Sequence, residues 1–265
     1  MKRGPLRKFF GIYSQYIRIA FSAAAAYRPD FFLGLLIHLA GNMLLPLLTI
    51  LIYANGAAFP GWSFHESLLI QSVFMLSMGV CAPFFGNMVW MTMDYVREGT
   101  YDLLMLKPGS PIFITVAGSF GFEHTGALAG GIVMFVYSMA NRHAPPFSGM
   151  LLFILLFTMG VCLYLGCILL MSAACFKWVG NSRLFEIYDA LAMFGRYPST
   201  IFSGTLRAAV TYAVPVAMLG FLPATALLGR VTGEMLFGSL ACLAFLAMGW
   251  GVYRRMLYLY QSAGG

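Results

Sequence analysis

The chain has 265 residues, 60% of them hydrophobic and only 9% charged, and its formal net charge is +7. A typical soluble domain carries about 25% charged residues, so this composition excludes a water-exposed globular protein. We therefore predict an all-α, polytopic membrane protein, a single domain over residues 1–265, with six transmembrane helices of ~20 residues each. The five cysteines are odd in number and lie in apolar stretches, which argues against a disulfide framework.

Residues 1–30 are the most basic part of the chain. They contain Lys2, Arg3, Arg7, Lys8, Arg18 and Arg28, with aromatic and aliphatic residues between them. This pattern predicts an amphipathic helix on the cytoplasmic surface of the membrane, with its cations near anionic lipid headgroups. The alternative is a basic tail that only orients the chain. In either case membrane lipid accounts for the positive charge, and we expect no nucleic-acid partner.

Further apolar runs predict membrane spans at residues 31–53, 68–93, 112–139, 150–176 and 235–253. Most of them exceed the length needed to cross a ~30 Å hydrocarbon core, so we expect them to tilt.

The stretch 184–230 has to supply one more crossing. We expect one helix rising from Arg183 to about Tyr197, followed by a broken, re-entrant return near the outer surface over residues 198–230. Irregular backbone at membrane depth is tolerated only where protein or a water-lined cavity covers it. The residues that mark this outer region are Tyr197, Pro198, Pro215 and Pro223.

The lysines and arginines set the orientation. With the N-terminus inside, twelve of the 16 lie in predicted cytoplasmic segments, and Arg142 alone lies in a clear outer loop. The remaining three, Arg196, Arg207 and Arg230, fall in the ambiguous stretch. Both termini are therefore predicted to be cytoplasmic, which requires an even number of crossings and fits six.

Residues 94–111 form a cytoplasmic segment between the second and third spans, and residues 97–111 read Arg-Glu-Gly-Thr-Tyr-Asp-Leu-Leu-Met-Leu-Lys-Pro-Gly-Ser-Pro. We predict a short helix here that ends before the prolines at 108 and 111. Its apolar face is expected to consist of Tyr101, Leu103, Leu104 and Leu106. Exposed leucines on a rigid short helix are typical of a docking element for a partner protein. The alternative is an interfacial helix that rests on lipid.

Three ionisable residues lie inside predicted spans: His38 in the first, and Glu123 and His124 in the third. Such groups are costly at this depth and usually face a cavity or a partner. One interpretation is a translocation pathway that meets a cationic or polar substrate. The other is a structural Glu123 paired with a histidine or arginine of another helix. Because adjacent residues of an α-helix point about 100° apart, and no His-x-x-x-His occurs, we expect no metal site.

Two further features belong to the predicted spans and their ends. Arg196 directly precedes Tyr197 and Pro198. We expect it to anchor the outer break, either by bonding free backbone carbonyls or by pairing with an acid. Gly126 and Gly130 form a Gly-x-x-x-Gly pattern, whose spacing suits close helix packing or a dimer seam.

The stretch 97–111 resembles the coupling-helix region of permeases of type-2 ABC exporters, with its arginine-glycine, acidic-leucine-leucine and proline pattern. Residues 194–229 resemble the Arg-Tyr-Pro and Val-Pro blocks of a bacterial subfamily of those permeases. The basic N-terminus and the six-span topology match as well, so the resemblance covers nearly the whole chain.

The resemblance implies a permease subunit in a bacterial inner membrane, forming half of the pathway of an ATP-driven exporter. A second permease subunit, identical or different, would complete the pathway, and separate cytoplasmic ATPases would bind the coupling helices. The residues expected at that contact are Arg97, Glu98, Tyr101, Asp102, Leu103, Leu104 and Lys107. The sequence has no Gly-x-x-x-x-Gly-Lys-Ser/Thr phosphate loop. We therefore expect no enzymatic activity and no cofactor on this chain, with ATP and Mg bound by the partner ATPase.

Other functions remain open from the sequence. A proton-coupled secondary transporter would use Glu123, His124 and His38 as a proton relay, and it would be expected to show a repeat between the two halves, which we do not find. An intramembrane enzyme acting on lipids would need clustered acids, histidines or a serine–histidine pair. A membrane scaffold without transport activity is the third alternative. No residue indicates which substrate is moved.

Overall fold

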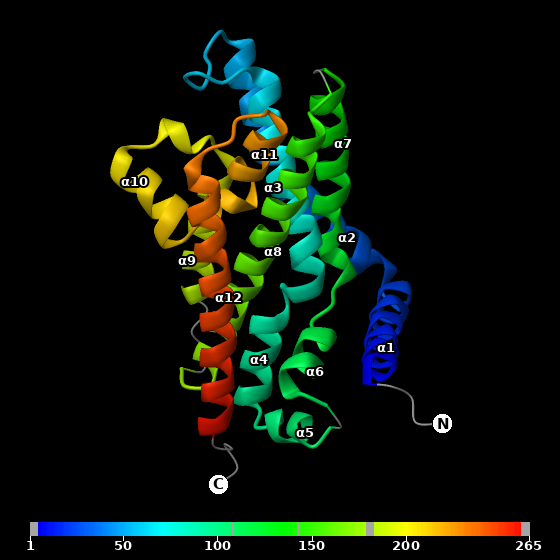
Figure 1. Ribbon diagram of the computed structural model, residues 1–265. Coiled ribbons are helices and arrows are strands. Elements are labelled where there is room, and N and C mark those ends of the chain that lie inside the picture. Colours follow the sequence, from blue (N-terminus) through cyan, green and yellow to red (C-terminus); the bar gives the residue numbers. More distant parts are fainter. Residues whose placement is uncertain (1–4, 108, 142–143, 179–182, 261–265) are drawn as a thin grey trace.

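The structure is a computed structural model that describes residues 5–107, 109–141, 144–178 and 183–260, with side chains from residue 11 onward. All regular secondary structure in these residues is helical (Figure 1). Four helical stretches are long and apolar enough to cross a membrane: Arg28–Ala54, Phe64–Arg97, Phe147–Cys175 and Gly233–Leu259. The prediction of an all-α membrane protein is confirmed, whereas two of the six expected spans are not among these four stretches.

Helix α1 (Pro5–Ala26) leads directly into α2 (Arg28–Ala54). A proline in the first turn and Asp30 nearby suit the start of α2, because this turn has unpaired N–H groups and a positive dipole end. In Figure 1, α1 lies to one side of the main bundle. It packs on α2, α6 (Pro111–Gly118) and the 3₁₀ turn η1 (Phe122–Thr125). The predicted N-terminal helix therefore forms, and its position at the membrane surface stays a prediction.

The second predicted span consists of α3 (Phe64–Phe85) and α4 (Met88–Arg97), with a break at Gly86 and Asn87. The N-terminus of α3 is fixed by a capping box in which the Ser63 hydroxyl and the Glu66 carboxylate each accept a backbone N–H. The capping box sets the start of the helix four residues before the predicted boundary at residue 68.

The third predicted span, residues 112–139, is not one helix. It is divided into α6, η1 and α7 (Gly126–Ala140), with an extended break before η1. The break is held by α3, whose Pro83 and Phe84 carbonyls accept bonds from Gly121 N (2.9 Å) and Ser119 Oγ (2.9 Å). Two interrupted helices thus satisfy each other's backbone groups, which an apolar environment requires.

Helix α8 (Phe147–Cys175) is the centre of the bundle, and α12 (Gly233–Leu259) packs along it (Figure 1). Their contact is close because glycines meet where they cross. A Cβ on Gly166 would lie 2.7 Å from backbone atoms of Phe245 and Leu246, and one on Gly249 would lie 2.4 Å from the Gly166 carbonyl oxygen. Close approach of this kind is how helices associate where lipid weakens the hydrophobic driving force.

Between α8 and α12 the chain is broken into short pieces, as predicted. They are α9 (Arg183–Ala192), η2 (Met193–Arg196), η3 (Ser199–Ile201), α10 (Gly204–Ala208), the π-turn η4 (Ala209–Ala213), η5 (Val216–Leu219) and α11 (Phe221–Leu227). Helix α9 ends at Ala192, with the 3₁₀ turn η2 continuing to Arg196, and at ten residues α9 is too short to be the expected crossing by itself. Every residue of η5 and α11 is buried, whereas α10 projects from the side of the bundle (Figure 1). Its relation to a membrane surface stays a prediction.

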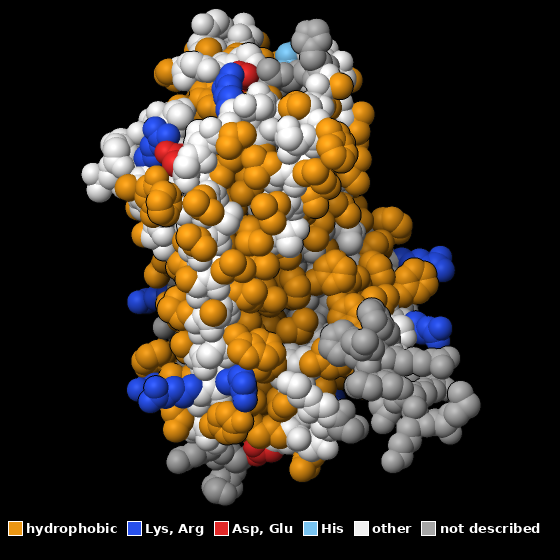
Figure 2. Space-filling model, in the orientation of Figure 1, with side chains coloured by type: hydrophobic (Ala, Val, Ile, Leu, Met, Phe, Trp, Pro, Cys, Tyr) orange, Lys and Arg blue, Asp and Glu red, His pale blue; other side chains and the backbone are white. Residues whose placement is uncertain are grey.

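The start of α1, the short helix α5 (Tyr101–Met105) and the end of α12 lie towards the same end of the molecule (Figure 1). The face in Figure 2 is mostly apolar in its middle, with charged side chains mainly towards the two ends. This distribution is the one expected of a bundle that crosses a hydrocarbon layer.

Candidate functional site

The predicted coupling segment contains α5, the short helix expected from the sequence. Its four apolar residues do not form one exposed face, which corrects the prediction. Tyr101 and Leu104 are buried, whereas Leu103 and Leu106 are 63% and 81% exposed. Successive residues of a helix point in different directions, so a leucine pair at 103 and 104 cannot share one face.

The buried side of α5 is an aromatic clamp, formed by Tyr101, Phe176, Tyr253 and Tyr260. The Tyr101 and Tyr253 hydroxyls are 2.9 Å apart, and the Tyr101 ring meets the Phe176 ring edge-on at 4.9 Å. Burial raises the pKa of Tyr101, while its hydrogen bonds act in the opposite direction, so the phenol stays neutral at physiological pH. The clamp therefore fastens α5 to the ends of α8 and α12.

The other predicted coupling residues surround the exposed leucines. Arg97, Glu98 and Lys107 are exposed and Asp102 is half-buried. Arg97 pairs with Asp94 at 2.9 Å on the surface. The face available to a partner thus comprises Arg97, Glu98, Leu103, Leu106 and Lys107. Leu106 was missing from the expected contact set, and only tertiary packing distinguishes it from Leu104.

The three ionisable residues of the predicted spans come together at the breaks in the helices. The His38 and His124 rings are 4.4 Å apart, and Glu123 Oε1 lies 3.6 Å from His124 Nε2. Glu123 and His124 both bind Asn87. The Asn87 Nδ2 donates to Glu123 Oε1 (3.1 Å), and its Oδ1 accepts from His124 Nε2 (3.0 Å).

Glu123 and His124 lie in a 3₁₀ turn and not in the expected α-helix, and their side chains still approach each other because both bind Asn87. Asn87 was not singled out from the sequence, although it follows Gly86 in an otherwise apolar run. Among the described residues, no group of three or more histidines, cysteines or acids is arranged to hold a metal ion.

A cavity of about 440 Å³, which we call the polar cavity, lies next to this cluster. Its polar lining includes His38, Asn42, Asn87, His124, Asp189 and Arg196, and its apolar lining includes Phe74, Trp90 and Phe185. These residues come from α2, α3, α4, α9, η1, η2 and the α3–α4 break. Segments far apart in the sequence therefore converge on one internal space.

Arg196 was expected to bond backbone carbonyls or to pair with an acid, and among the described residues it does neither. Its Nη2 donates to Asn42 Oδ1 at 3.1 Å, and its guanidinium lies 4.7 Å from the centre of the Phe74 ring. Neither a backbone carbonyl nor an acid of the described residues serves as the anchor. Arg196 thus belongs to the polar cavity and ties η2 to α2 and α3.

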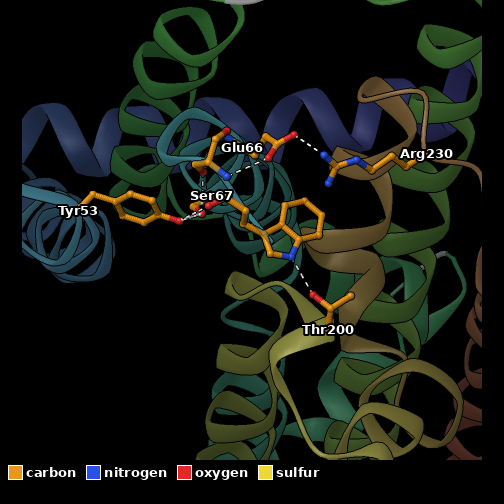
Figure 3. Close-up of polar contacts among 7 residues, drawn as sticks. Tyr53, Glu66, Ser67, Thr200 and Arg230 are labelled. Carbon is orange, nitrogen blue, oxygen red and sulfur yellow. Dashed lines mark hydrogen bonds and ion pairs between the residues drawn. The ribbon is translucent and has the colours of Figure 1, made fainter. Parts of the chain in front are cut away.

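At the opposite end from α5 (Figure 1), four residues form what we call the outer latch: Trp62, Glu66, Thr200 and Arg230, of which Figure 3 labels the last three. Arg230 Nη2 lies 2.6 Å from Glu66 Oε1, and its guanidinium lies 4.7 Å from the centre of the Trp62 ring. Trp62 Nε1 donates to Thr200 Oγ1 at 2.8 Å. The latch connects the loop before α3 to the broken region on both sides of α11.

The predicted outer residues support the broken region from within. Pro198, Pro215 and Pro223 are buried, and Tyr197 packs edge-on against Phe59 of the loop before α3 at 6.0 Å. Of the latch residues, only Arg230 had been noted in the sequence, as a cation of ambiguous location. The Ser63–Glu66 spacing was the signal that could have pointed to Glu66.

Gly126 and Gly130 lie at a contact between two helices of this chain. A Cβ on Gly126 would lie 2.4 Å from the Leu35 carbonyl oxygen of α2, and one on Gly130 would lie 2.4 Å from the Met43 methyl. Both glycines therefore let α7 approach α2 closely, which is the packing alternative.

In comparisons with known proteins, one family matches this chain. The sequence profile described as "ABC-2 family transporter protein" matches residues 37–264, which include α5, the polar cavity and the outer latch. Neither curated proteins nor solved structures yield a significant match to the chain.

Proposed function

Because this chain belongs to the ABC-2 family of transporter proteins, matching it over residues 37–264, we propose that it is the permease subunit of an ATP-driven exporter. It would form half of the translocation pathway in a bacterial inner membrane, with both termini on the cytoplasmic side. The hydrolysis of ATP, with its Mg, would take place on a separate ATPase subunit, in keeping with the missing phosphate loop.

The observation that carries this proposal is the division of α5 into two sides. One side exposes Leu103 and Leu106 between charged residues, and the other is buried in the aromatic clamp. Exposed apolar residues with a charged rim suit a protein groove, in which apolar contacts supply affinity and charges set register. A helix that only rested on lipid would not need such a firm attachment to α8 and α12.

The clamp suggests how movement would pass into the membrane. A force on the exposed side of α5 would act through Tyr101 on Phe176 at the end of α8 and on Tyr253 of α12. Since α8 and α12 pack closely through their glycines, they would move as one unit. Closure of the ATPases would then tilt this unit relative to the rest of the bundle, opening and closing the pathway.

A second permease subunit would complete the pathway, as a homodimer or a heterodimer. The exposed apolar surfaces of α2 and α12 leave area for lipid and for such a partner. Because the Gly126–Gly130 pattern is occupied by α2, it does not serve as the seam.

Co-purification from native membranes in mild detergent tests the contact. We expect wild type to bring down a protein that carries a phosphate loop and hydrolyses ATP, identified by mass spectrometry. The double variant Leu103→Asp, Leu106→Asp should lose it while unfolding at the same temperature as wild type, because both side chains are exposed. Leu104 is unsuitable for this test because it is buried, and a charge there would disrupt folding.

The matched control is Tyr258→Asp, Leu259→Asp at the end of α12, where the side chains are 79% and 63% exposed. This variant carries the same change in charge at the same end of the molecule and should keep the ATPase. The proposal fails if wild type purifies with no ATPase, or if the control loses it as completely as the α5 variant.

A proton-coupled transporter is the second candidate, and the contacts among His38, His124 and Glu123 favour it. In proteoliposomes containing this chain alone, it predicts transport driven by a pH gradient without ATP. Glu123→Gln should abolish that transport. The exporter proposal predicts no transport from the chain alone, and ATP-dependent transport once its partners are present.

A further inference from the structure

The polar cavity is lined by both polar and aromatic side chains. Asn42, His38, His124 and Arg196 supply polar groups, while Phe74, Trp90 and Phe185 supply aromatic surface. The Trp90 and Phe185 rings are 5.7 Å apart and form one wall. Two of its lining residues, Trp90 of α4 and Met193 of η2, are partly exposed. A space of this kind suits a molecule with one polar and one apolar end.

The positive charge and the N–H donors of Arg196 in the cavity are only partly paired. Among the described residues, no carboxylate lies within 4.0 Å of the Arg196 guanidinium, although Asp189 lines the same cavity. The guanidinium has five N–H donors. Its Nη2 uses one on Asn42, and its Nε is buried without a partner. A charged group in an apolar bundle with unused donors is costly, and an anion would relieve that cost.

Two other features of the cavity favour an anion. Tyr188 also lines the cavity, and its hydroxyl is buried without a hydrogen-bond partner, so it has a free hydrogen-bond donor. The rings of His38 and His124, whose centres are 4.4 Å apart, each carry at least one ring N–H donor, while the Glu123 carboxylate on this side lies 3.6 Å from His124 Nε2. Arginine in particular binds phosphate and carboxylate oxygens through two parallel N–H groups.

We infer that the polar cavity binds the anionic head of an amphipathic molecule, a phosphate or carboxylate group that contacts Arg196, with its apolar chain lying against Trp90 and Phe185. This inference names a substrate class for the pathway proposed above and so rests on that proposal. Such a molecule would enter from the membrane past the partly exposed Trp90 and Met193.

The test uses the purified full chain in dodecyl maltoside and follows its thermal unfolding by intrinsic fluorescence. The probes are dodecyl phosphate, dodecyltrimethylammonium and inorganic phosphate. A ligand that binds only the folded state raises the unfolding temperature, by about 3 °C or more once it is far above its Kd. We expect this rise with dodecyl phosphate only. A response to inorganic phosphate alone at the same concentration would overturn the amphipathic part of the inference, and a response to dodecyltrimethylammonium would overturn the choice of an anion.

Two variants test whether Arg196 binds the anionic head. Arg196→Gln should weaken dodecyl phosphate binding about 10- to 100-fold, the usual effect of removing a charge-assisted contact. Asn42→Asp keeps the arginine but places a carboxylate beside Nη2, so it should abolish the response without removing any cavity wall. If Arg196→Gln fails to fold, Asn42→Asp alone decides. An undiminished response in Asn42→Asp would overturn the inference.

The control variant is Arg254→Gln, Arg255→Gln on α12, which removes two exposed positive charges distant from the cavity. It should bind dodecyl phosphate like wild type. If it loses as much binding as Arg196→Gln, the surfactant acts on the basic surface and the inference fails. Co-purification of the ATPase through α5 does not depend on these outcomes, so failure of the cavity inference and failure of the exporter proposal are distinguishable.

Discussion

The two ends of the molecule are held together by different chemistry. At the end near α5, the aromatic clamp joins three helices through packed rings and a single bond between the Tyr101 and Tyr253 hydroxyls. At the other end, the outer latch joins a loop to the broken region through an ion pair, a cation–π contact and the Trp62–Thr200 hydrogen bond (Figure 3).

The difference indicates which end transmits force and which end opens. Apolar packing has no strict direction, so the clamp can tolerate small movements while α5, α8 and α12 stay attached. The latch depends on a few polar contacts, and the Arg230 side chain is half-exposed to solvent, where water can replace the lost partner. We therefore expect the clamp to be the stronger of the two, and the latch to be the place where the bundle opens.

The largest effect is expected from the clamp. Tyr101→Ala should lower the free energy of unfolding by about 3–5 kcal/mol, because it removes a fully buried ring and leaves a cavity. Thermal unfolding in mild detergent measures it. Tyr101→Phe is the control, since it keeps the ring and removes only the hydroxyl, at a cost of about 1 kcal/mol. Equal losses in the two variants would show that packing is not what holds α5.

A smaller effect is expected from the ion pair of the latch. Arg230→Gln should cost about 1–2 kcal/mol, because the buried Glu66 loses this ion pair while Arg230 was partly solvated. A double-mutant cycle with Glu66→Gln isolates the pair from the capping of α3. We expect a coupling of about 1 kcal/mol that decreases at high salt. A coupling larger than the free energy lost in Tyr101→Ala would show that the latch, and not the clamp, is the stronger of the two.

The Trp62–Thr200 bond should matter less. Thr200→Val preserves the shape of the side chain but leaves the buried indole N–H of Trp62 without its partner, at a cost of about 1 kcal/mol. Thr205→Val on α10, away from the latch, is a matched substitution that should have almost no effect on the unfolding temperature.

The smallest change in stability is expected at the exposed side of α5. Arg97→Ala breaks a surface ion pair with Asp94 that contributes about 0.5 kcal/mol or less. If Arg97 lies at the rim of the ATPase contact, the same variant should weaken ATPase recovery in the co-purification. An unchanged recovery would remove Arg97 from the predicted contact without affecting the role of the leucines.

Most of the helical plan could be predicted from the sequence. Long apolar runs identified four of the spans, the charges identified the segment at 94–111, and prolines and glycines identified the broken region before α12. The third predicted span was wrong in its continuity, because an apolar run does not reveal that Gly121 and Ser119 bind carbonyls of α3 instead of continuing a helix. The residues of the candidate site were partly found: Asn87, Asn42 and Glu66 were not, and Leu106 was placed on the apolar face but left out of the expected contact.

The sequence by itself determined that this chain is a helical membrane protein with a short helix between its second and third apolar runs, since length and apolarity are properties of each segment alone. Tertiary structure decided which side of each helix faces protein. Leu103 and Leu104 are identical neighbours in a helix of five residues, so the pattern within α5 cannot separate them. Only the packing of α5 on α8 and α12, and the meeting of two interrupted helices at Asn87, made that choice.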